Sequence, residues 1–306
     1  MAYGLPMLRS MKSLLLPVSV LLALVAGILG FAAPALANTP INQVVQLGDS
    51  YSAGYGVLAV NRAATGADCG DDRFFDTSAV PGGRLAASLG VPLEFQACGG
   101  AEIPDVVEQF RTAQAAISGD GSGTLIVFTA GGNDVRSVRG EMWTDLLQRC
   151  ILWDGSCERR SANQLGNLDA VAQDMSALVD EIATALPGAQ IRVLGYPELF
   201  QRTPGCWGVT GVDRREADFL DGLARELNDA LEAAVVGVAD ASGGDIAWVD
   251  VETDFDDHGA CQTEWSGERF VNDTEFVPWT LTVAANSFHP TAQGYDAYSR
   301  ALTASI

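Results

Sequence analysis

The stretch QVVQLGDSYSAG, residues 43–54, joins an apolar run to three residues that favour turns. Val44, Val45 and Leu47 have the character of a buried strand. Gly48 and Asp49 then lead directly into Ser50. Glycine tolerates backbone angles that other residues avoid, and Asp and Ser side chains hydrogen-bond the local main chain. The stretch therefore predicts a strand that ends in a tight turn before a helix, and such a turn can present Ser50 as a nucleophile.

Four further apolar runs, bounded by Gly, Pro or polar residues, alternate with helical patterns along the chain. The five expected strands cover 44–47, 93–97, 124–130, 191–195 and 246–251. Apolar spacing predicts a helix over 165–186, a second that begins at Asp213 with a capping box to Glu216, and a third over 291–304. This alternation indicates a parallel sheet within one α/β domain, with ligands bound at the carboxyl ends of the strands. The segments 141–161 and 254–287 are predicted to be irregular.

The first 37 residues have the order of a secretory signal peptide. Arg9 and Lys12 precede the apolar run 14–31, and the small residues of APALA (33–37) offer a cleavage site after Ala37. An uncleaved membrane anchor is the alternative, which Pro17 within the apolar run disfavours. We therefore expect 1–37 to be removed and 38–306 to form the secreted domain, with no stable membrane anchor after cleavage.

Charge and cysteine content narrow the class of protein. The formal net charge of −21 repels nucleic acid and anionic membrane surfaces, so we expect neither as a partner, and we expect a monomer. Six cysteines behind a signal peptide indicate disulfides, whose pairing the sequence alone leaves open. Because the chain has no C-x-x-C pair and only two histidines, we do not expect a zinc site.

Polar residues follow the first three expected strands, where a parallel sheet places its binding crevice. Ser50 follows the first strand, Gly100 the second, and Asn133 the third, while His289 lies just before the last helix. Acyl transfer to a serine needs a base and donors for the oxyanion. Ser50 and His289 can act as nucleophile and base, and the N–H groups of Ser50 and Gly100 with the Asn133 amide can act as donors. His258, in an acidic loop, is the less favoured base.

These residues occur in four sequence blocks whose order resembles that of the SGNH (GDSL) hydrolases. The blocks are GDSYSAG (48–54), Gly100, GGND (131–134) and SFHP (287–290). The segments ACGGA (97–101) and DHGACQTEW (257–265), with six cysteines, are similar to secreted actinobacterial lipases and esterases of that family. The resemblance implies a three-layer α/β/α sandwich with a flavodoxin-like, five-stranded parallel sheet.

The resemblance also implies chemistry. It implies cofactor-free hydrolysis of a small-molecule or lipid carboxylic ester by Ser50 and His289, with an oxyanion hole of Ser50, Gly100 and Asn133. Phospholipase A and glycan O-acetyl esterase are alternative activities of the same machinery. The implied disulfides pair the cysteines in sequence order: Cys69–Cys98, Cys150–Cys157 and Cys206–Cys261.

One residue departs from the family pattern. Many members carry Asp three residues before the histidine, whereas this chain has Asn286. Either the Asn286 side-chain oxygen accepts a hydrogen bond from His289 Nδ1–H, or a main-chain carbonyl near 286 does so and leaves a Ser-His dyad. The missing Asp also leaves open a non-catalytic binding protein of the same fold.

Overall fold

The computed structural model describes residues 39–57, 77–152, 157–200, 212–260, 269–274 and 286–306, together with positions 1 and 284. Apart from residue 1, the predicted signal peptide lies outside these ranges. So do Cys69, Cys206 and Cys261, and with them two of the three predicted disulfide pairings. Over the described ranges, no helix combines the length and apolar character that a bilayer span requires.

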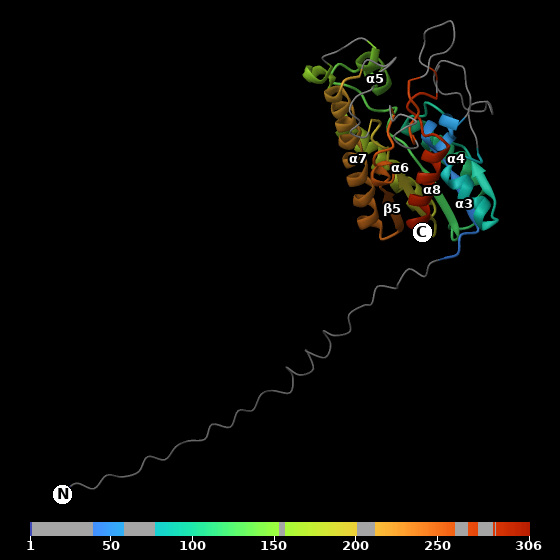
Figure 1. Ribbon diagram of the computed structural model, residues 1–306. Helices are drawn as coiled ribbons and strands as arrows, with labels where there is room; N and C mark the ends of the chain where they lie inside the picture. Colours follow the sequence, from blue (N-terminus) through green and yellow to red (C-terminus); the bar gives the residue numbers. More distant parts are fainter. Residues whose placement is uncertain are drawn as a thin grey trace. The chain divides into compact units, whose positions relative to one another are not determined.

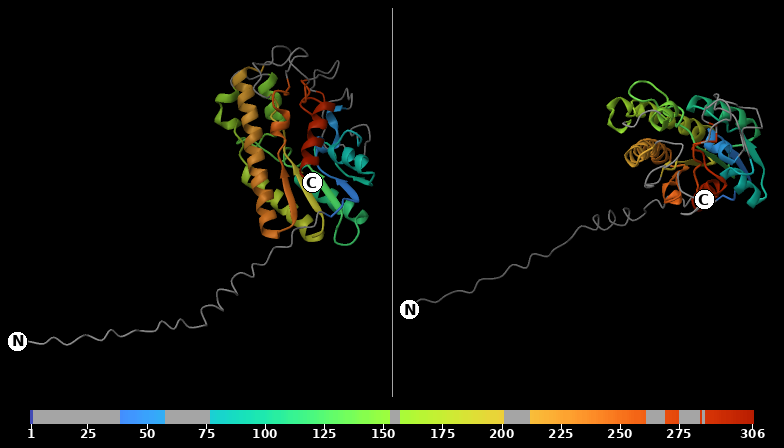
Figure 2. Two further views of the ribbon diagram at one scale, coloured as in Figure 1. Left: turned by 60° about the horizontal axis from the view of Figure 1, so that its bottom comes forward. Right: turned by 45° about the horizontal axis from the view of Figure 1, so that its top comes forward.

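Five parallel strands form the central sheet, and all five lie where the apolar runs predicted them. They are β1 Gln43–Gln46, β2 Leu93–Phe95, β3 Thr124–Phe128, β4 Gln190–Leu194 and β5 Asp245–Val249. Their order is β2-β1-β3-β4-β5, and they lie side by side in the left view of Figure 2. This is the flavodoxin-like order, in which the connections reverse direction at β1 and a crevice forms beyond the carboxyl ends of β1 and β3.

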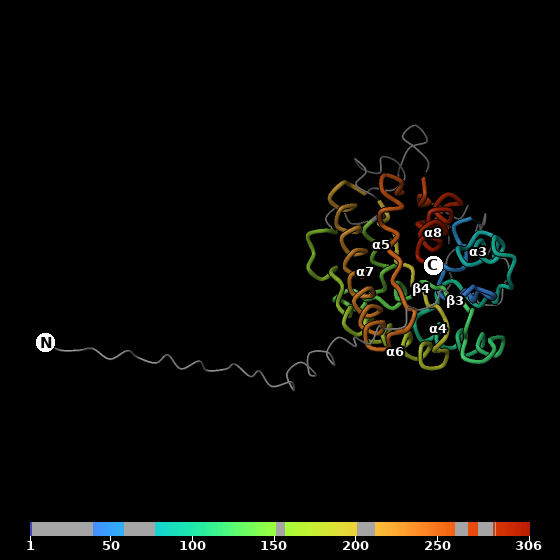
Figure 3. Tube along the Cα trace, turned by 90° about the horizontal axis from the view of Figure 1, so that it is seen from below, coloured from blue at the N-terminus to red at the C-terminus, as the bar shows by residue number. Residues whose placement is uncertain are grey.

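Helices cover both faces of the sheet, so the predicted α/β/α sandwich is confirmed. The helices are α2 Ser50–Ala53, α3 Pro81–Leu89, α4 Ile103–Ala113, α5 Trp143–Leu152, α6 Leu168–Ala185, α7 Arg214–Ser242 and α8 Ala292–Ala304 (Figure 1). The helices α3 and α8 pack on one face, and α4 and α6 pack on the other, where α7 joins them (Figure 3).

Successive side chains of each central strand pack on opposite faces of the sheet. Val44 and Leu125 pack in the layer of α3 and α8, whereas Val45 and Ile126 pack in the layer of α4 and α6. All four are fully buried. A strand covered on both faces is mostly apolar at consecutive positions, which explains the consecutive apolar residues of β1 and β3.

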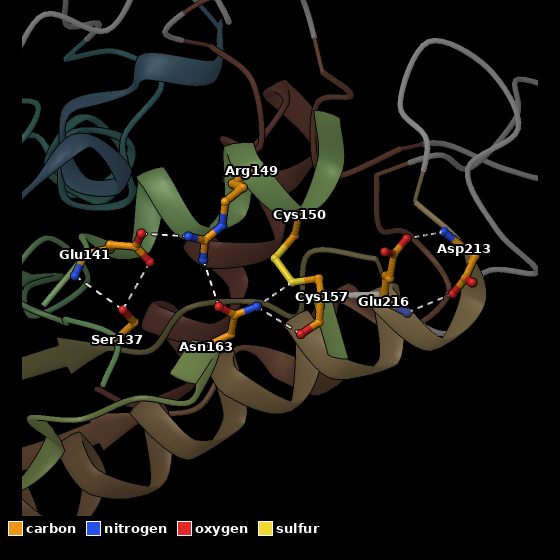
Figure 4. The surroundings of a disulfide bond; sticks show 8 residues. All are labelled: Ser137, Glu141, Arg149, Cys150, Cys157, Asn163, Asp213 and Glu216. Atoms are coloured by element: carbon orange, nitrogen blue, oxygen red, sulfur yellow. Dashed lines mark hydrogen bonds and ion pairs between the residues drawn. A yellow bond between two sulfur atoms is a disulfide. The ribbon is translucent and has the colours of Figure 1, made fainter. Parts of the chain in front are cut away.

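Three predicted helices are present. The pattern over 165–186 corresponds to α6, and the pattern over 291–304 corresponds to α8, which Thr291 caps by accepting from the Gly294 N–H. The capping box of α7 is confirmed: Asp213 accepts from the Glu216 N–H at 3.0 Å, and the Glu216 carboxylate accepts from the Asp213 N–H at 3.0 Å (Figure 4).

The prediction of an irregular segment over 141–161 is wrong in part, because α5 lies within it. Leu146 and Cys150 are buried, so the helix is held by its packing against the rest of the core. The predicted disulfide Cys150–Cys157 is present and ties the end of α5 to the segment that follows (Figure 4). Asn163 supports this link, since it donates to the Cys157 carbonyl at 3.0 Å and accepts from Arg149 at 2.8 Å.

Gly48 is the residue of the first turn that tolerates least change. Its φ is +114°, and a Cβ there would lie 2.3 Å from the Thr129 carbonyl oxygen. We expect Gly48→Ala to lower the free energy of unfolding in urea by about 3 kcal/mol or more, since it adds backbone strain to a clash. Gly90→Ala is the matched control, because Gly90 has φ +68° with open space around it. Gly90→Ala should lower the free energy of unfolding by about 1 kcal/mol, and equal losses for the two variants would contradict this account.

Candidate active site

Ser50 lies at the start of the short helix α2, directly after β1. Asp49 caps this helix by accepting from the Tyr51 N–H at 2.9 Å, and Gly54 ends it with φ +84°. The Ser50 side chain is half-buried, and its Oγ lies 2.7 Å from Nε2 of His289. The structure thus brings together two residues that are 239 positions apart in the sequence.

Asp49 is buried beneath this turn and orders it. Its carboxylate accepts from the Thr129 hydroxyl at 2.6 Å and from the Tyr196 hydroxyl at 2.5 Å, in addition to the Tyr51 N–H. Burial raises the pKa of Asp49, and the hydrogen bonds from Thr129 and Tyr196 oppose that rise. The sequence hypothesis that Asp49 shapes the turn agrees with this geometry.

His289 is held by its own turn. Its Nδ1 lies 3.0 Å from the main-chain oxygen of Ser287, a carbonyl next to residue 286, which agrees with the second of the two predicted arrangements. The Asn286 carbonyl instead accepts from the His289 main-chain N–H at 3.2 Å. A carbonyl can only accept, so Nδ1 carries a proton, and in its neutral form the ring presents Nε2 to Ser50 as an acceptor.

Phe288, between these residues, has φ +60°, a left-handed conformation that is uncommon for a bulky residue. The Tyr51 hydroxyl donates to the Phe288 carbonyl at 2.5 Å, so the helix that carries Ser50 also holds the strained turn of His289. The rings of Tyr51 and Tyr55 flank the imidazole, with centroids 5.1 Å and 5.6 Å away. Such strain persists only where the surroundings enforce it, and it concentrates at functional sites.

Two of the three predicted oxyanion donors, Gly100 and Asn133, lie on loops that are tied to each other. Gly100 has φ +77°, which favours glycine, and Asn133 Nδ2 donates to the carbonyl of the adjacent Ala101 at 3.0 Å. An amide nitrogen has two hydrogens, so one is left for a substrate. Among the residues that the structure describes, the main-chain N–H groups of Ser50 and Gly100 have no hydrogen-bond partner.

Several supporting residues were missed in the sequence. Gln109 of α4 is buried and makes two bonds with Gly48, accepting from its N–H at 2.7 Å and donating to its carbonyl at 3.0 Å. Its only signal is a polar residue on the apolar face of a helix, between Val106 and Phe110. Tyr196 lies two residues after the end of β4, so the strand-end rule that selected Ser50 could have found it. The alternative base, His258, stacks on Phe270 with ring centroids 3.9 Å apart.

Asp134, next to Asn133, gives a pH-dependent prediction. Burial is the main cause that raises its pKa to about 7, and hydrogen bonding from the Ile103 N–H, at 3.0 Å to each carboxylate oxygen, opposes this. The folded protein therefore holds this proton more tightly than the unfolded chain, and stability is lost as the pH rises from about 4 to about 7. Asp134→Asn keeps the acceptor for Ile103. From pH 4 to pH 8, the free energy of unfolding of this variant in urea should rise relative to that of wild type by on the order of 1–2 kcal/mol.

The control for this prediction is Asp120→Asn. Asp120 is exposed, and hydrogen bonding from Ser122 lowers its pKa. The ionised Asp120 stabilises the fold at neutral pH, and this stabilisation is lost on acidification. The change in the free energy of unfolding with pH, relative to wild type, should therefore have opposite signs in the two variants. Parallel pH profiles for the two variants would contradict the assignment.

Comparison with known proteins places the chain in a family. Residues 47–297 match the GDSL-like Lipase/Acylhydrolase family. A lipase of Streptomyces rimosus is 29% identical over 273 residues, which cover 86% of this chain and 87% of that protein. The crystal structure of the extracellular lipase from Streptomyces rimosus matches with a TM-score of 0.62 at 27% identity, covering 87% of this chain and 100% of that one. Phospholipase A1 from Streptomyces albidoflavus NA297 matches in fold with a TM-score of 0.63 at 24% identity, with the same coverage. The chain therefore belongs to the GDSL-like lipase/acylhydrolase family and is a carboxylic ester hydrolase.

Proposed function

We propose that the protein hydrolyses carboxylic esters through an acyl-enzyme on Ser50, with His289 as the general base. The observation that carries this proposal is the contact of 2.7 Å between Ser50 Oγ and His289 Nε2, with Nδ1 held 3.0 Å from the Ser287 carbonyl. Both distances lie in the range expected for a nucleophile and an oriented base.

In the first half-reaction, Ser50 Oγ attacks the ester carbonyl carbon while His289 Nε2 takes the hydroxyl proton. The carbonyl oxygen becomes an oxyanion, which the N–H groups of Ser50 and Gly100 and the second N–H of Asn133 stabilise. The tetrahedral intermediate collapses, and His289 returns the proton to the departing alcohol. The acyl group remains on Ser50.

In the second half-reaction, water attacks the acyl carbonyl carbon and gives its proton to His289. The same donors stabilise the second oxyanion, and collapse releases the carboxylic acid with the proton returned to Ser50 Oγ. Because only a neutral imidazole can accept a proton, activity should fall on acidification.

The histidine is oriented by a main-chain carbonyl in this proposal, so the site works as a Ser-His dyad. Asn286→Ala should lower kcat by less than about tenfold, because the Ser287 carbonyl stays in place. His289→Ala should lower kcat by about 10⁴-fold or more. The measurement is kcat on p-nitrophenyl butyrate well below the melting temperature of each variant. A loss for Asn286→Ala close to that for His289→Ala would show that the Asn286 side chain orients the base.

The proposal also covers the cellular location and the oligomeric state of the protein. Residues 1–37 act as a signal peptide that is removed on export, and residues 38–306 work as a secreted monomer. An extracellular lipase from Streptomyces rimosus among the relatives supports export. Mass spectrometry of the protein from the culture medium tests it, with an N-terminus at Asn38 as the expected result.

A substrate series tests the activity itself. Wild-type protein and Ser50→Ala are assayed on p-nitrophenyl esters from acetyl to palmitoyl, on phosphatidylcholine and on acetylated xylan. We expect ester hydrolysis by wild type that Ser50→Ala lacks. Preference for phosphatidylcholine or for acetylated xylan would identify a phospholipase A or a glycan esterase with the same machinery. Hydrolysis of none of these substrates would contradict the proposal and favour a binding protein.

A further inference from the structure

The Tyr196 hydroxyl bridges the two loops that carry the proposed nucleophile and the proposed oxyanion amide. It donates to the Asp49 carboxylate at 2.5 Å and accepts from the Gly132 main-chain N–H at 3.0 Å. Asp49 directly precedes Ser50, and Gly132 directly precedes Asn133. The same phenol oxygen therefore bonds to a residue after the end of β1 and to a residue after the end of β3.

Tyr196 is itself held in place from two sides. Asn228 of α7 accepts from the Tyr196 main-chain N–H at 3.0 Å and donates to its carbonyl at 2.7 Å. The Tyr196 ring meets the Tyr51 ring edge-on, with centroids 5.3 Å apart. Gly132 lies close against this ring, since a Cβ there would lie 3.1 Å from Tyr196 Cζ. The phenol is a fixed spacer between the two loops.

The direction of each bond in the bridge is settled by the charges. Burial and the neighbouring Asp49 carboxylate raise the pKa of Tyr196 well above its ordinary value, so the phenol keeps its proton. The phenol O–H then donates to Asp49, and a lone pair of the phenol oxygen accepts from the Gly132 N–H, which can only donate. A donor to a buried carboxylate makes a strong, short hydrogen bond.

We propose that Tyr196 is a positioning residue for ester hydrolysis: its hydroxyl sets the distance between Ser50 and the oxyanion donor Asn133. This inference rests on the proposed function. Small displacements of reacting groups are costly, because a misplacement of about 1 Å can lower a rate by about 10²-fold. Without the hydroxyl, the Asp49 turn and the Gly132 loop lose their common partner and can move apart.

The test compares Tyr196→Phe with two matched variants. Thr129→Val removes the other side-chain donor to Asp49 but leaves the Gly132 bond intact. Tyr298→Phe removes a hydroxyl from another buried tyrosine, which donates to the Gly195 carbonyl at 2.7 Å and not to Asp49. Each variant is assayed for kcat and KM on p-nitrophenyl butyrate, and for the Ki of a trifluoromethyl ketone, which forms an oxyanion in the site.

We expect Tyr196→Phe to lower kcat by about 10- to 100-fold, to leave KM within about threefold, and to raise the Ki of the ketone in proportion to the loss in kcat. Tyr298→Phe should keep kcat and Ki near wild type. Thr129→Val should destabilise the protein with a Ki within about threefold of wild type. An unchanged Ki for Tyr196→Phe, or an equal rise for Thr129→Val, would overturn the proposal.

Wild type and Ser50→Ala are included so that the two proposals fail separately. Wild type without esterase activity would contradict the proposed function, whereas an active wild type with a fully active Tyr196→Phe would contradict only the role of Tyr196. If Tyr196→Phe does not fold, 3-fluorotyrosine at position 196 keeps the side-chain volume and changes the acidity of the phenol. We then expect kcat and Ki to change together, and no change in either would overturn the proposal.

Discussion

Replacing Ser50 with alanine is expected to lower kcat/KM on a short p-nitrophenyl ester by about 10⁴- to 10⁶-fold. In the proposed mechanism the acyl-enzyme can then no longer form, and only the oxyanion donors and substrate binding remain. The fold should not change, because no hydrogen bond that supports the turn uses the Ser50 hydroxyl except its bond to His289 Nε2 among the described residues. Steady-state kinetics, with circular dichroism to verify folding, measures this effect.

Ser52→Ala is the matched control for that variant. Ser52 lies two residues away in the same helix, is buried, and accepts from the Thr129 main-chain N–H at 2.8 Å. Its loss should lower stability by about 1–3 kcal/mol, because a buried N–H loses its partner, while the reacting hydroxyl remains. If the two serine variants lost activity equally, Ser50 would not be distinguished as the nucleophile.

Replacing Asn133 with alanine is expected to lower kcat by about 10²- to 10³-fold while KM changes little. In the proposed mechanism the amide stabilises charge that develops only in the transition state, so its removal acts on kcat rather than on ground-state binding. Asn133 also donates to the Ala101 carbonyl at 3.0 Å, so part of the loss comes from a looser Gly100 loop. The Ki of a trifluoromethyl ketone should rise with the loss in kcat.

Asn167→Ala separates these two contributions. Asn167 is another loop amide, which donates to the Asp134 carbonyl at 2.9 Å and accepts from the Arg136 N–H at 2.7 Å. Its removal loosens the loop that carries Asn133 without removing a proposed oxyanion donor. We expect a smaller loss in kcat than for Asn133→Ala, and losses of the same size would assign the effect to loop order alone.

The central strands β1 and β3 were predictable because each one is covered on both faces. That burial demands consecutive apolar residues, which are easy to recognise between Gly, Pro and polar positions. The helix α3 (PGGRLAASL) was not predicted, because Gly82 and Gly83 lower its helix propensity. In the structure, a Cβ on Gly82 would lie 2.5 Å from Gln46 Oε1 and 2.8 Å from Val127 Cγ1. Close packing on the sheet thus favours this helix, whose local signals are Pro81 at its start and Gly90 at its end.

In the candidate site, too, some features were predictable from the sequence and others were not. Ser50, Gly100 and Asn133 follow strand ends, so a parallel topology alone predicts that they share one edge of the sheet. The acceptor for His289 was not predictable to the residue, since any main-chain carbonyl has the same chemistry and only the turn at Phe288 decides that Ser287 supplies it. Contacts such as Tyr196 with Asp49 depend on side chains that meet across 147 positions of sequence.

Labelling with a fluorophosphonate tests the central claim most directly, because this reagent forms a covalent bond only with an activated serine. The wild-type protein is treated, digested and analysed by mass spectrometry. We predict one phosphonyl group per chain, on the peptide that contains Ser50, and labelling that is strongly slowed in His289→Ala. An adduct on another residue, or ester hydrolysis that persists without any adduct on Ser50, would contradict the assignment of Ser50 as a nucleophile activated by His289.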